Sequence, residues 1–286
     1  MMNDEYGRSM KHSKLRGTIW SYVILVIMAV IVLIPILWMV STSIKIESET
    51  HTIPPQWIPD HPTLESYKRL WSEYPFLTYF KNSIIISAGA VILSVIFSCL
   101  AGYGVTRFRF KGKGSFLSFL LVTQMFPSIM LLIPYYKVLD MYHLKDTLVG
   151  MMLVYISFTV PFCSWMMVGF FRTIPLELDE AAIIDGCSRW KAFRKIVLPM
   201  TLPGISSSAI YAFITAWNEY MFAQVLINTP DLKTVPLGIA ELNGYYKILW
   251  NDMMAASVIA SLPLVILFIF LQKYFISGLT AGAVKA

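Results

Sequence analysis

The sequence predicts an all-α polytopic membrane protein with about six transmembrane helices. Hydrophobic residues make up 57% of the 286 residues, and charged residues make up only 14%. A soluble domain of this size cannot bury so large a share of apolar side chains. The apolar residues also gather into about six separate runs, each long enough to cross the hydrocarbon core of a bilayer. In such a protein the net charge of +6 reports orientation and says little about nucleic acid.

The first run predicts a retained membrane span. Residues 1–17 are polar and basic, and an apolar run follows from Thr18 to about Ile44. This run is too long for a signal peptide and lacks a small-residue cleavage site. We therefore expect residues 1–17 to form an N-terminal tail and residues 18–286 to form the transmembrane domain.

The second and fifth runs carry small residues at every fourth position. Such a stripe lets a neighbouring helix approach closely. The stripe in the second run, Asn82–Thr106, consists of Ala90, Ser94, Ser98 and Gly102. The stripe in the fifth run, Gly204–Ile227, consists of Gly204, Ser208, Ala212 and Ala216.

The other three runs contain prolines. The third run, Ser115–Ile133, is interrupted in its middle by Gln124 and Pro127. The fourth, Thr147–Phe171, contains Pro161, and the sixth, Met253–Gln272, contains Pro263. Each proline inside a helix removes a backbone hydrogen bond, so we expect bends at these points.

Lysine and arginine set the orientation. If the N-terminus is cytoplasmic, the basic residues in the inner segments outnumber those in the outer segments by nearly two to one. The positive-inside rule then predicts that both termini, and the segment 172–203 between the fourth and fifth runs, are cytoplasmic.

The segment 172–203 predicts a helix, a turn and a second helix. Pro175 can open the first helix, and Gly186 can end it because glycine readily adopts positive φ. Ser188 can cap the second helix, which places Trp190, Phe193 and Val197 on one side. Pro199 and Pro203 are expected to end that helix.

The same segment carries a spaced motif, which is Glu180-Ala181-Ala182, then Gly186, then Ile196, Leu198 and Pro199. This motif resembles the EAA loop of ABC-importer permeases, and the resemblance implies that the loop docks in a groove of a separate ATPase subunit and transmits its motion. We expect these residues, together with Asp185, to couple the permease to the ATPase. From the residues alone, the alternative is an amphipathic helix lying on the membrane surface.

Further stretches are similar to the carbohydrate branch of these permeases, and in particular to the shorter permease subunit of maltose-type transporters. They are Trp217–Ala223, the tail Gly278–Lys285, and Pro54–Pro59 with Leu64–Tyr67. The chain departs from the family in Cys187, where alanine is common, and in Ala286, where glycine is usual.

The resemblance implies a machine in a bacterial or archaeal cytoplasmic membrane. This chain would work with a homologous second permease, two ABC ATPase subunits and an extracytoplasmic sugar-binding protein. The sequence contains no phosphate-binding fingerprint, so ATP and Mg are expected on the ATPase subunits. We expect this chain to bind no cofactor and to perform no covalent chemistry.

Glu219 is the ionisable residue inside a clear span, and a charge at membrane depth indicates a functional site. We consider it a candidate for the substrate pathway, together with Asn218, Trp217, Tyr220 and, in the third run, Gln124. A sugar crossing apolar helices needs polar groups in place of its water. The alternative is that Glu219 only braces the helix through a structural hydrogen bond.

Other functions remain open at this point. An importer for another polar solute, such as a sugar phosphate, fits the same loop. A secondary transporter would show inverted repeats, and the sequence has no convincing one. The four histidines, His12, His51, His61 and His143, lie scattered outside the runs, and the three cysteines have no spaced partner, so neither a metalloenzyme nor a zinc site is indicated.

Overall fold

The computed structural model describes the backbone of residues 2–243 and 248–283 and the side chains of residues 17–243 and 248–273. Within these ranges the regular structure is helical, apart from one isolated bridge between Asn243 and Ile248. This confirms the predicted all-α class. The helices are α1 Met2–Ser43, α2 Glu47–Thr50, α3 Glu65–Ser72, α4 Phe76–Arg107, α5 Lys113–Thr123, α6 Leu132–Met141, α7 Leu148–Arg172, α8 Glu177–Ile184, α9 Arg189–Ala192, α10 Leu198–Met200, α11 Leu202–Trp217, α12 Met221–Leu226, α13 Val235–Glu241 and α14 Trp250–Ala283. Shorter turns of other types are the 3-10 turns η1 Ser128–Leu131 and η3 Pro230–Leu232 and the π-helical turn η2 Phe193–Val197.

Four of these helices are long and apolar enough to cross a membrane. They contain the segments Gly17–Ser43, Phe76–Arg107, Leu148–Arg172 and Trp250–Lys273. Two bent pairs also qualify as broken spans: Lys113–Thr123 with Ser128–Met141, bent by 97°, and Arg189–Met200 with Leu202–Trp217, bent by 75°. The described residues therefore supply four candidate spans, or up to six if each bent pair is one span.

The third run breaks where the sequence predicts, between Thr123 and Ser128. Its second half extends further than expected, because α6 continues to Met141 rather than ending at Ile133. Pro134 is no obstacle, since it lies in the first turn of α6, where its missing N–H has no helical partner to lose.

The fifth run differs more from the prediction. It is not one helix to Ile227: α11 ends at Trp217, and α12 begins at Met221. The helical segment before it also passes through Pro199 and ends at Met200, so the bend falls at Thr201. Pro199 is accommodated because the preceding turn is π-helical and the N–H of Leu198 bonds to the carbonyl of Phe193.

The contact pattern divides the chain into two units, which we describe separately. Unit 1 consists of residues 1–70 and 243–259, and unit 2 consists of residues 71–242 and 260–286. In unit 1, polar contacts hold the segment after α1. Arg69 pairs with the buried Asp252 at 2.5 Å, and the hydroxyls of Ser43 and Tyr67 lie 2.8 Å apart. The first contact joins α3 to the start of α14, and the second joins the end of α1 to α3.

The core of unit 2 is formed by α4, α7 and α11, which pack against one another. Both predicted small-residue stripes lie in this core, and all eight of their residues are buried. Ser94 of α4 and Thr159 of α7 share a hydrogen bond of 2.6 Å. A Cβ at Gly204 would lie 2.5 Å from Cγ of Phe170, so only glycine allows this approach of α11 to α7. The expectation that these stripes are packing faces is confirmed.

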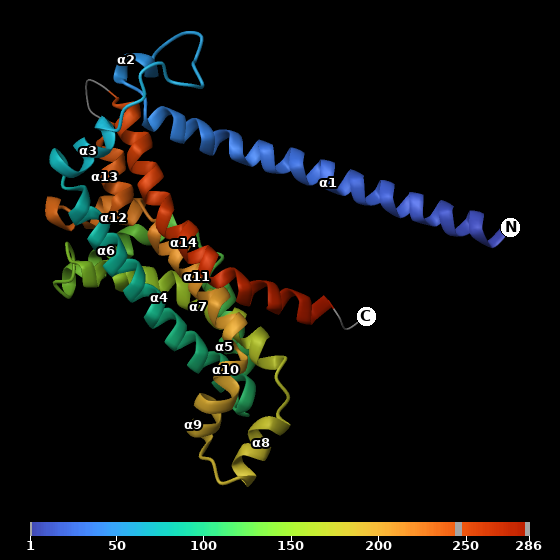
Figure 1. Ribbon diagram of the computed structural model, residues 1–286. Helices are drawn as coiled ribbons and strands as arrows, with labels where there is room; N and C mark the ends of the chain where they lie inside the picture. Colours follow the sequence, from blue (N-terminus) through green and yellow to red (C-terminus); the bar gives the residue numbers. More distant parts are fainter. Residues whose placement is uncertain (1, 244–247, 284–286) are drawn as a thin grey trace. The chain divides into compact units, whose positions relative to one another are not determined.

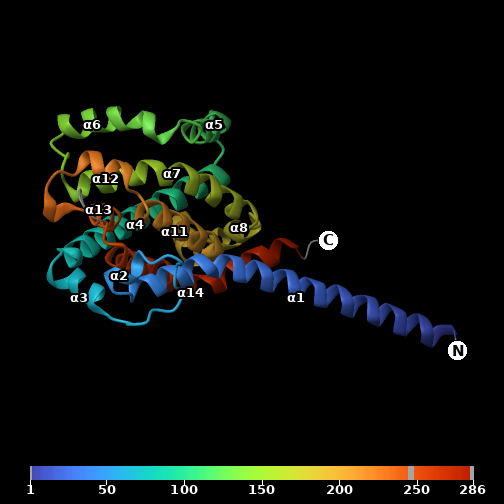
Figure 2. The same ribbon diagram turned by 90° about the horizontal axis from the view of Figure 1, so that it is seen from above.

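The two ends of unit 2 carry different elements (Figure 1). α8 and α9 lie at one end, beyond α4 and α7, whereas α12 and α13 lie at the other. Seen from above, α5 and α6 run along one side of the unit beside α7 and α12 (Figure 2), in agreement with the contacts of α5 with α7 and of α6 with α12. Both regions that the sequence predicts to be functional therefore lie in unit 2.

Candidate functional site

The 172–203 loop is the helix–turn–helix that the sequence predicts. α8 runs through Glu180, Ala181 and Ala182, and Gly186 follows it with a φ of 81°, a conformation that favours glycine. The hydroxyl of Ser188 accepts a hydrogen bond of 3.3 Å from the N–H of Lys191 and so caps α9. The local signals of this segment specify its turn and its cap, but not the end of its second arm, which continues through Pro199 to Met200.

The second arm of the loop is anchored to the core by two side chains. Phe193 and Val197 are buried in a cluster with Met167, Phe171 and Ile174. Trp190 lies on the same side as Phe193, with ring centres 5.3 Å apart, but it does not enter the buried cluster and is 61% exposed. The helix turns Trp190 outward because it stands at the exposed start of α9.

The end of the loop farthest from the core is apolar and uncovered. We call Ile183, Ile184 and Trp190 the loop tip; their side chains are 43%, 85% and 61% exposed. Of the predicted coupling residues, Glu180, Ala181, Asp185, Gly186 and Pro199 are exposed, Ile196 and Leu198 are partly buried, and Ala182 is buried. Large apolar side chains that stay exposed at the end of a loop of polar composition indicate a surface for another protein or a membrane.

At the other end of unit 2, Glu219 lies in the break between α11 and α12. Its carboxylate accepts hydrogen bonds from the N–H of Phe222 at 2.7 Å and of Ala223 at 3.1 Å, which are first-turn donors of α12. It also accepts one of 2.8 Å from the hydroxyl of Tyr155, a buried residue of α7. Because α12 begins with donors that no helical carbonyl can satisfy, the carboxylate stabilises the break.

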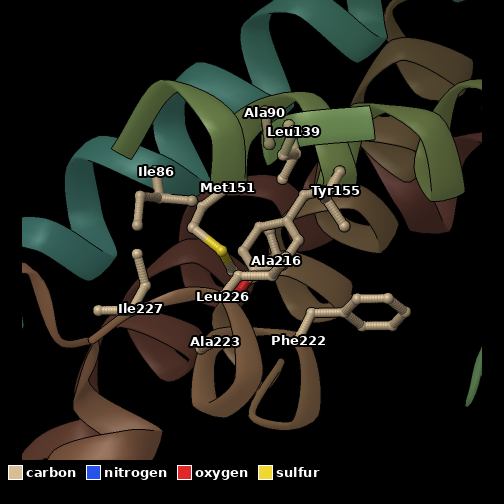
Figure 3. Packing of buried hydrophobic residues seen from close by; sticks show 11 residues of the cluster. Ile86, Ala90, Leu139, Met151, Tyr155, Ala216, Phe222, Ala223, Leu226 and Ile227 are labelled. Carbon is tan, nitrogen blue, oxygen red and sulfur yellow. The ribbon is translucent and has the colours of Figure 1, made fainter. Parts of the chain in front are cut away.

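Tyr155 reaches Glu219 through a packed apolar cluster. Figure 3 shows its ring between α7 and the turn of α12 that carries Phe222, Ala223 and Leu226. The cluster buries Tyr155 to 1% exposure, so its hydroxyl has a fixed direction. The position of Glu219 is thus set by contacts from two helices.

A cavity of about 320 Å³ lies beside the two helix breaks. Gln124, next to the break of the third run, and Glu219, in the break of the fifth, both line it. Its other polar side chains are Thr123, Ser128, Tyr211 and Thr215, and its apolar lining includes Phe126, Phe158 and Phe222. Phe158 and Phe222 form an aromatic pair with ring centres 4.9 Å apart.

The structure brings together Glu219 and Gln124 from the predicted set, but not the other three residues. Trp217 is buried, and its indole N–H donates 3.0 Å to the carbonyl of Ala260 in α14. Asn218 is exposed and its amide donates back to the carbonyl of Ile214, while Tyr220 is 37% exposed. None of these three is among the side chains that line the cavity.

Sequence reasoning missed Tyr211 and Thr215 as lining residues. A signal was available: Tyr211, Thr215 and Glu219 recur every fourth residue, which puts them along one face of the fifth run. Phe158 and Phe222 carried no such signal, because their approach depends on how α7 and α12 pack.

The fold and these two regions define a class of protein: a polytopic helical membrane protein with broken spans and an exposed helix–turn–helix loop. The family model "Binding-protein-dependent transport system inner membrane component" matches residues 94–280, and the chain belongs to this family. It is therefore the transmembrane permease subunit of a binding-protein-dependent ABC importer, a multi-pass inner-membrane protein that is not itself an ATPase.

Two curated relatives match nearly the whole chain. The trehalose/maltose transport system permease protein MalG of Thermococcus litoralis is 40% identical over 263 residues, covering 91% of this chain and 94% of the relative. The diacetylchitobiose uptake system permease protein DasC of Streptomyces coelicolor is 34% identical over 276 residues, covering 96% of this chain and all of the relative.

A solved structure shares the fold. A chain of a bacterial ABC transporter involved in the import of the acidic polysaccharide alginate matches with a TM-score of 0.77. The match covers 92% of this chain and 98% of that one at 24% identity. At this identity the likeness supports the fold alone.

Proposed function

We propose that this chain moves a neutral carbohydrate, a di- or oligosaccharide, into the cytoplasm. The observation that carries the proposal is the cavity at the helix breaks, whose lining combines a carboxylate, an amide and hydroxyls with phenylalanine rings. Sugar hydroxyls need fixed acceptors and donors when they leave water, and the apolar face of a sugar ring packs on an aromatic ring. The relatives named for trehalose, maltose and diacetylchitobiose support the same class of cargo.

The charge of the cavity argues for a neutral sugar over a sugar phosphate. Its lining includes Glu219 and, among the described residues, no lysine or arginine. Phosphate recognition relies on cationic side chains or clustered backbone N–H donors, and a nearby carboxylate repels an anion. An importer of an anionic solute is therefore the second candidate.

The 172–203 loop is proposed to couple this chain to an ATPase. Its uncovered loop tip supports docking to another protein, and the anchored arms support transmission of force to the core. In this proposal the two ABC ATPase subunits bind ATP and Mg, and this chain contributes no cofactor site. The loop and both termini face the cytoplasm, as the lysine and arginine distribution indicates.

The other proposed partners are a homologous second permease and an extracytoplasmic sugar-binding protein. The exposed apolar surface of α1 and α14 meets lipid or the second permease. The sugar path is shared between the two permeases, so Glu219 and Gln124 supply one side of it.

Uptake by the reconstituted complex tests this function. The complex is placed in vesicles with ATP at the loop side and the binding protein at the other, and accumulation of labelled maltose, trehalose, chitobiose, glucose 6-phosphate and an amino acid is measured. We expect ATP-dependent accumulation of at least one neutral disaccharide. Accumulation of the sugar phosphate alone would favour the second candidate, and uptake independent of ATP would contradict the proposal.

A further inference from the structure

Asp179 is the one acid of the first turn of α8 that faces the core. Glu177 and Glu180 in the same turn are exposed, whereas Asp179 is buried. The dipole of α8 favours acids in its first turn, but it does not require any of them to leave water. A buried carboxylate is costly unless a cation and hydrogen-bond donors meet it.

The partners of Asp179 come from the last turns of α4. Nε of Arg107 lies 2.8 Å from one carboxylate oxygen, and both side chains are nearly buried, at 6% and 11% exposure. The hydroxyl of Tyr103 donates to the other oxygen at 2.9 Å. Tyr103 and Arg107 are four residues apart, so they lie on the same face of α4.

The same two side chains also hold the rest of the 172–203 loop. The guanidinium of Arg107 also donates a hydrogen bond of 3.0 Å to the carbonyl of Ile174, where the chain leaves α7. The ring of Tyr103 packs on Phe193 of the second arm, with centres 4.6 Å apart. The entry and both arms of the loop are thus attached to one end of one helix.

A buried ion pair of this kind is weak evidence for stability. Replacing both partners with apolar residues of similar volume often leaves the folding stability unchanged, whereas removing one partner lowers it by leaving an uncompensated buried charge. What the pair does supply is a fixed geometry between α8 and α4. α4 in turn packs along α7 and α11, which line the cavity at the opposite end of unit 2.

We propose that Arg107, Tyr103 and Asp179 form a clasp that makes α4 move with the 172–203 loop when the ATPase displaces it. The clasp is a set of positioning residues, and the inference rests on the proposed coupling function of the loop. It differs from docking: the loop tip contacts the partner, while the clasp carries the displacement into the bundle. A variant without the clasp should therefore still bind the ATPase and hydrolyse ATP, but it should deliver less sugar for each ATP hydrolysed.

The test compares sugar delivered per ATP hydrolysed in the reconstituted complex. The variants are Asp179→Asn and the double variant Arg107→Met with Asp179→Leu, which removes the pair without leaving a lone charge. Glu177→Gln and Arg109→Gln are matched controls, since both residues are exposed and neighbour the clasp in sequence. Co-purification of the ATPase with each variant reports docking, and Gly186→Val reports the function of the loop itself.

We expect both clasp variants to lower the sugar-to-ATP ratio about fivefold or more with ATPase binding retained, and both controls to match the wild type. An unchanged ratio in both clasp variants, with Gly186→Val uncoupled, would overturn the clasp and leave the proposed function standing. Loss of the ATPase from the clasp variants would also overturn it, because the residues would then only shape the docking surface. A fully coupled Gly186→Val complex would remove the proposed function and the clasp with it.

Discussion

The two ends of unit 2 are built in opposite ways. The turn of the 172–203 loop is specified by neighbours in sequence, with the Ser188 cap and the positive φ of Gly186 within a few residues of each other, although Tyr103 and Arg107 attach the loop to α4. The break at Asn218–Tyr220 is held from a distance, since Tyr155 donates to Glu219 across 64 positions of the chain. The loop exposes its apolar tip, whereas the break gathers polar groups around a cavity. A surface for a partner can thus form locally, but a polar site inside the bundle depends on tertiary packing.

The largest effect is expected from Gly186→Val, which should disrupt the 172–203 loop and leave the cavity end of unit 2 unchanged. A Cβ added at Gly186 would have no atom within 4 Å, so the free-energy cost of the substitution comes from the positive φ of the backbone. A β-branched residue at positive φ costs about 1–3 kcal/mol, and we expect uptake to fall about tenfold or more while the protein still inserts. Gly186→Asn is the matched control, because asparagine tolerates this conformation. Full sugar-stimulated ATPase activity in Gly186→Val would contradict the account.

Ala212→Leu should disturb the core of unit 2, and so the loop and the cavity alike. Ala212 is fully buried in the α11 stripe, and overpacking such a site costs about 1–3 kcal/mol. We expect several-fold less assembled complex in detergent, measured by size-exclusion chromatography. Ile214→Leu, on the exposed side of the same helix, should assemble normally. Normal assembly of Ala212→Leu would mean that this face does not pack tightly.

Tyr155→Phe tests the structural role of Glu219 at the helix break separately from its role as a cavity-lining residue. The change removes one donor to the carboxylate and keeps the two backbone N–H groups. We expect the midpoint of thermal unfolding to fall by about 2–6 °C, with uptake within about threefold of the wild type. A complete loss of uptake with unchanged thermal stability would assign Tyr155 to the sugar path instead.

The smallest effect concerns Asp146, which ties the loop after α6 to the chain after α12. Burial raises the pKa of Asp146, but hydrogen bonds from Thr229 and from the N–H of Asn228 outweigh it and lower the pKa below its ordinary value. Because the pKa is lower in the folded state, the contact contributes its full stability at pH values above the ordinary pKa. That stability is lost as the pH falls through the pKa of the folded state. The difference in unfolding midpoint between the wild type and Asp146→Asn, about 2 °C at pH 7, should shrink as the pH falls below the ordinary pKa of an aspartate and vanish below the lowered pKa of the folded state. A constant difference across this range would show that the charge is irrelevant.

The sequence predicts the loop end more fully than the break end, for a physical reason. Gly186 and Ser188 act through φ preference and capping, which are properties of single residues. The end of α11 at Trp217 was not predicted, because no glycine or proline follows Gly204 in the run to mark the break, and the carboxylate of Glu219 that caps α12 acts through tertiary structure. Trp217 was expected beside the sugar but is directed to Ala260, since an indole N–H in an apolar core must find an acceptor. Gln124 and Glu219 were expected together on polarity alone, and both line the cavity.

The most direct test of the account is Glu219→Gln in the reconstituted complex, with sugar uptake and ATP hydrolysis measured in the same vesicles. The amide keeps the shape but replaces one accepting oxygen with an NH₂ group and removes the charge. The account predicts that uptake falls about tenfold, while ATP hydrolysis stimulated by the binding protein and the yield of assembled complex stay within about twofold of the wild type. If uptake is unchanged, or if it falls only in step with assembly, Glu219 braces the helix break and the sugar does not pass beside it.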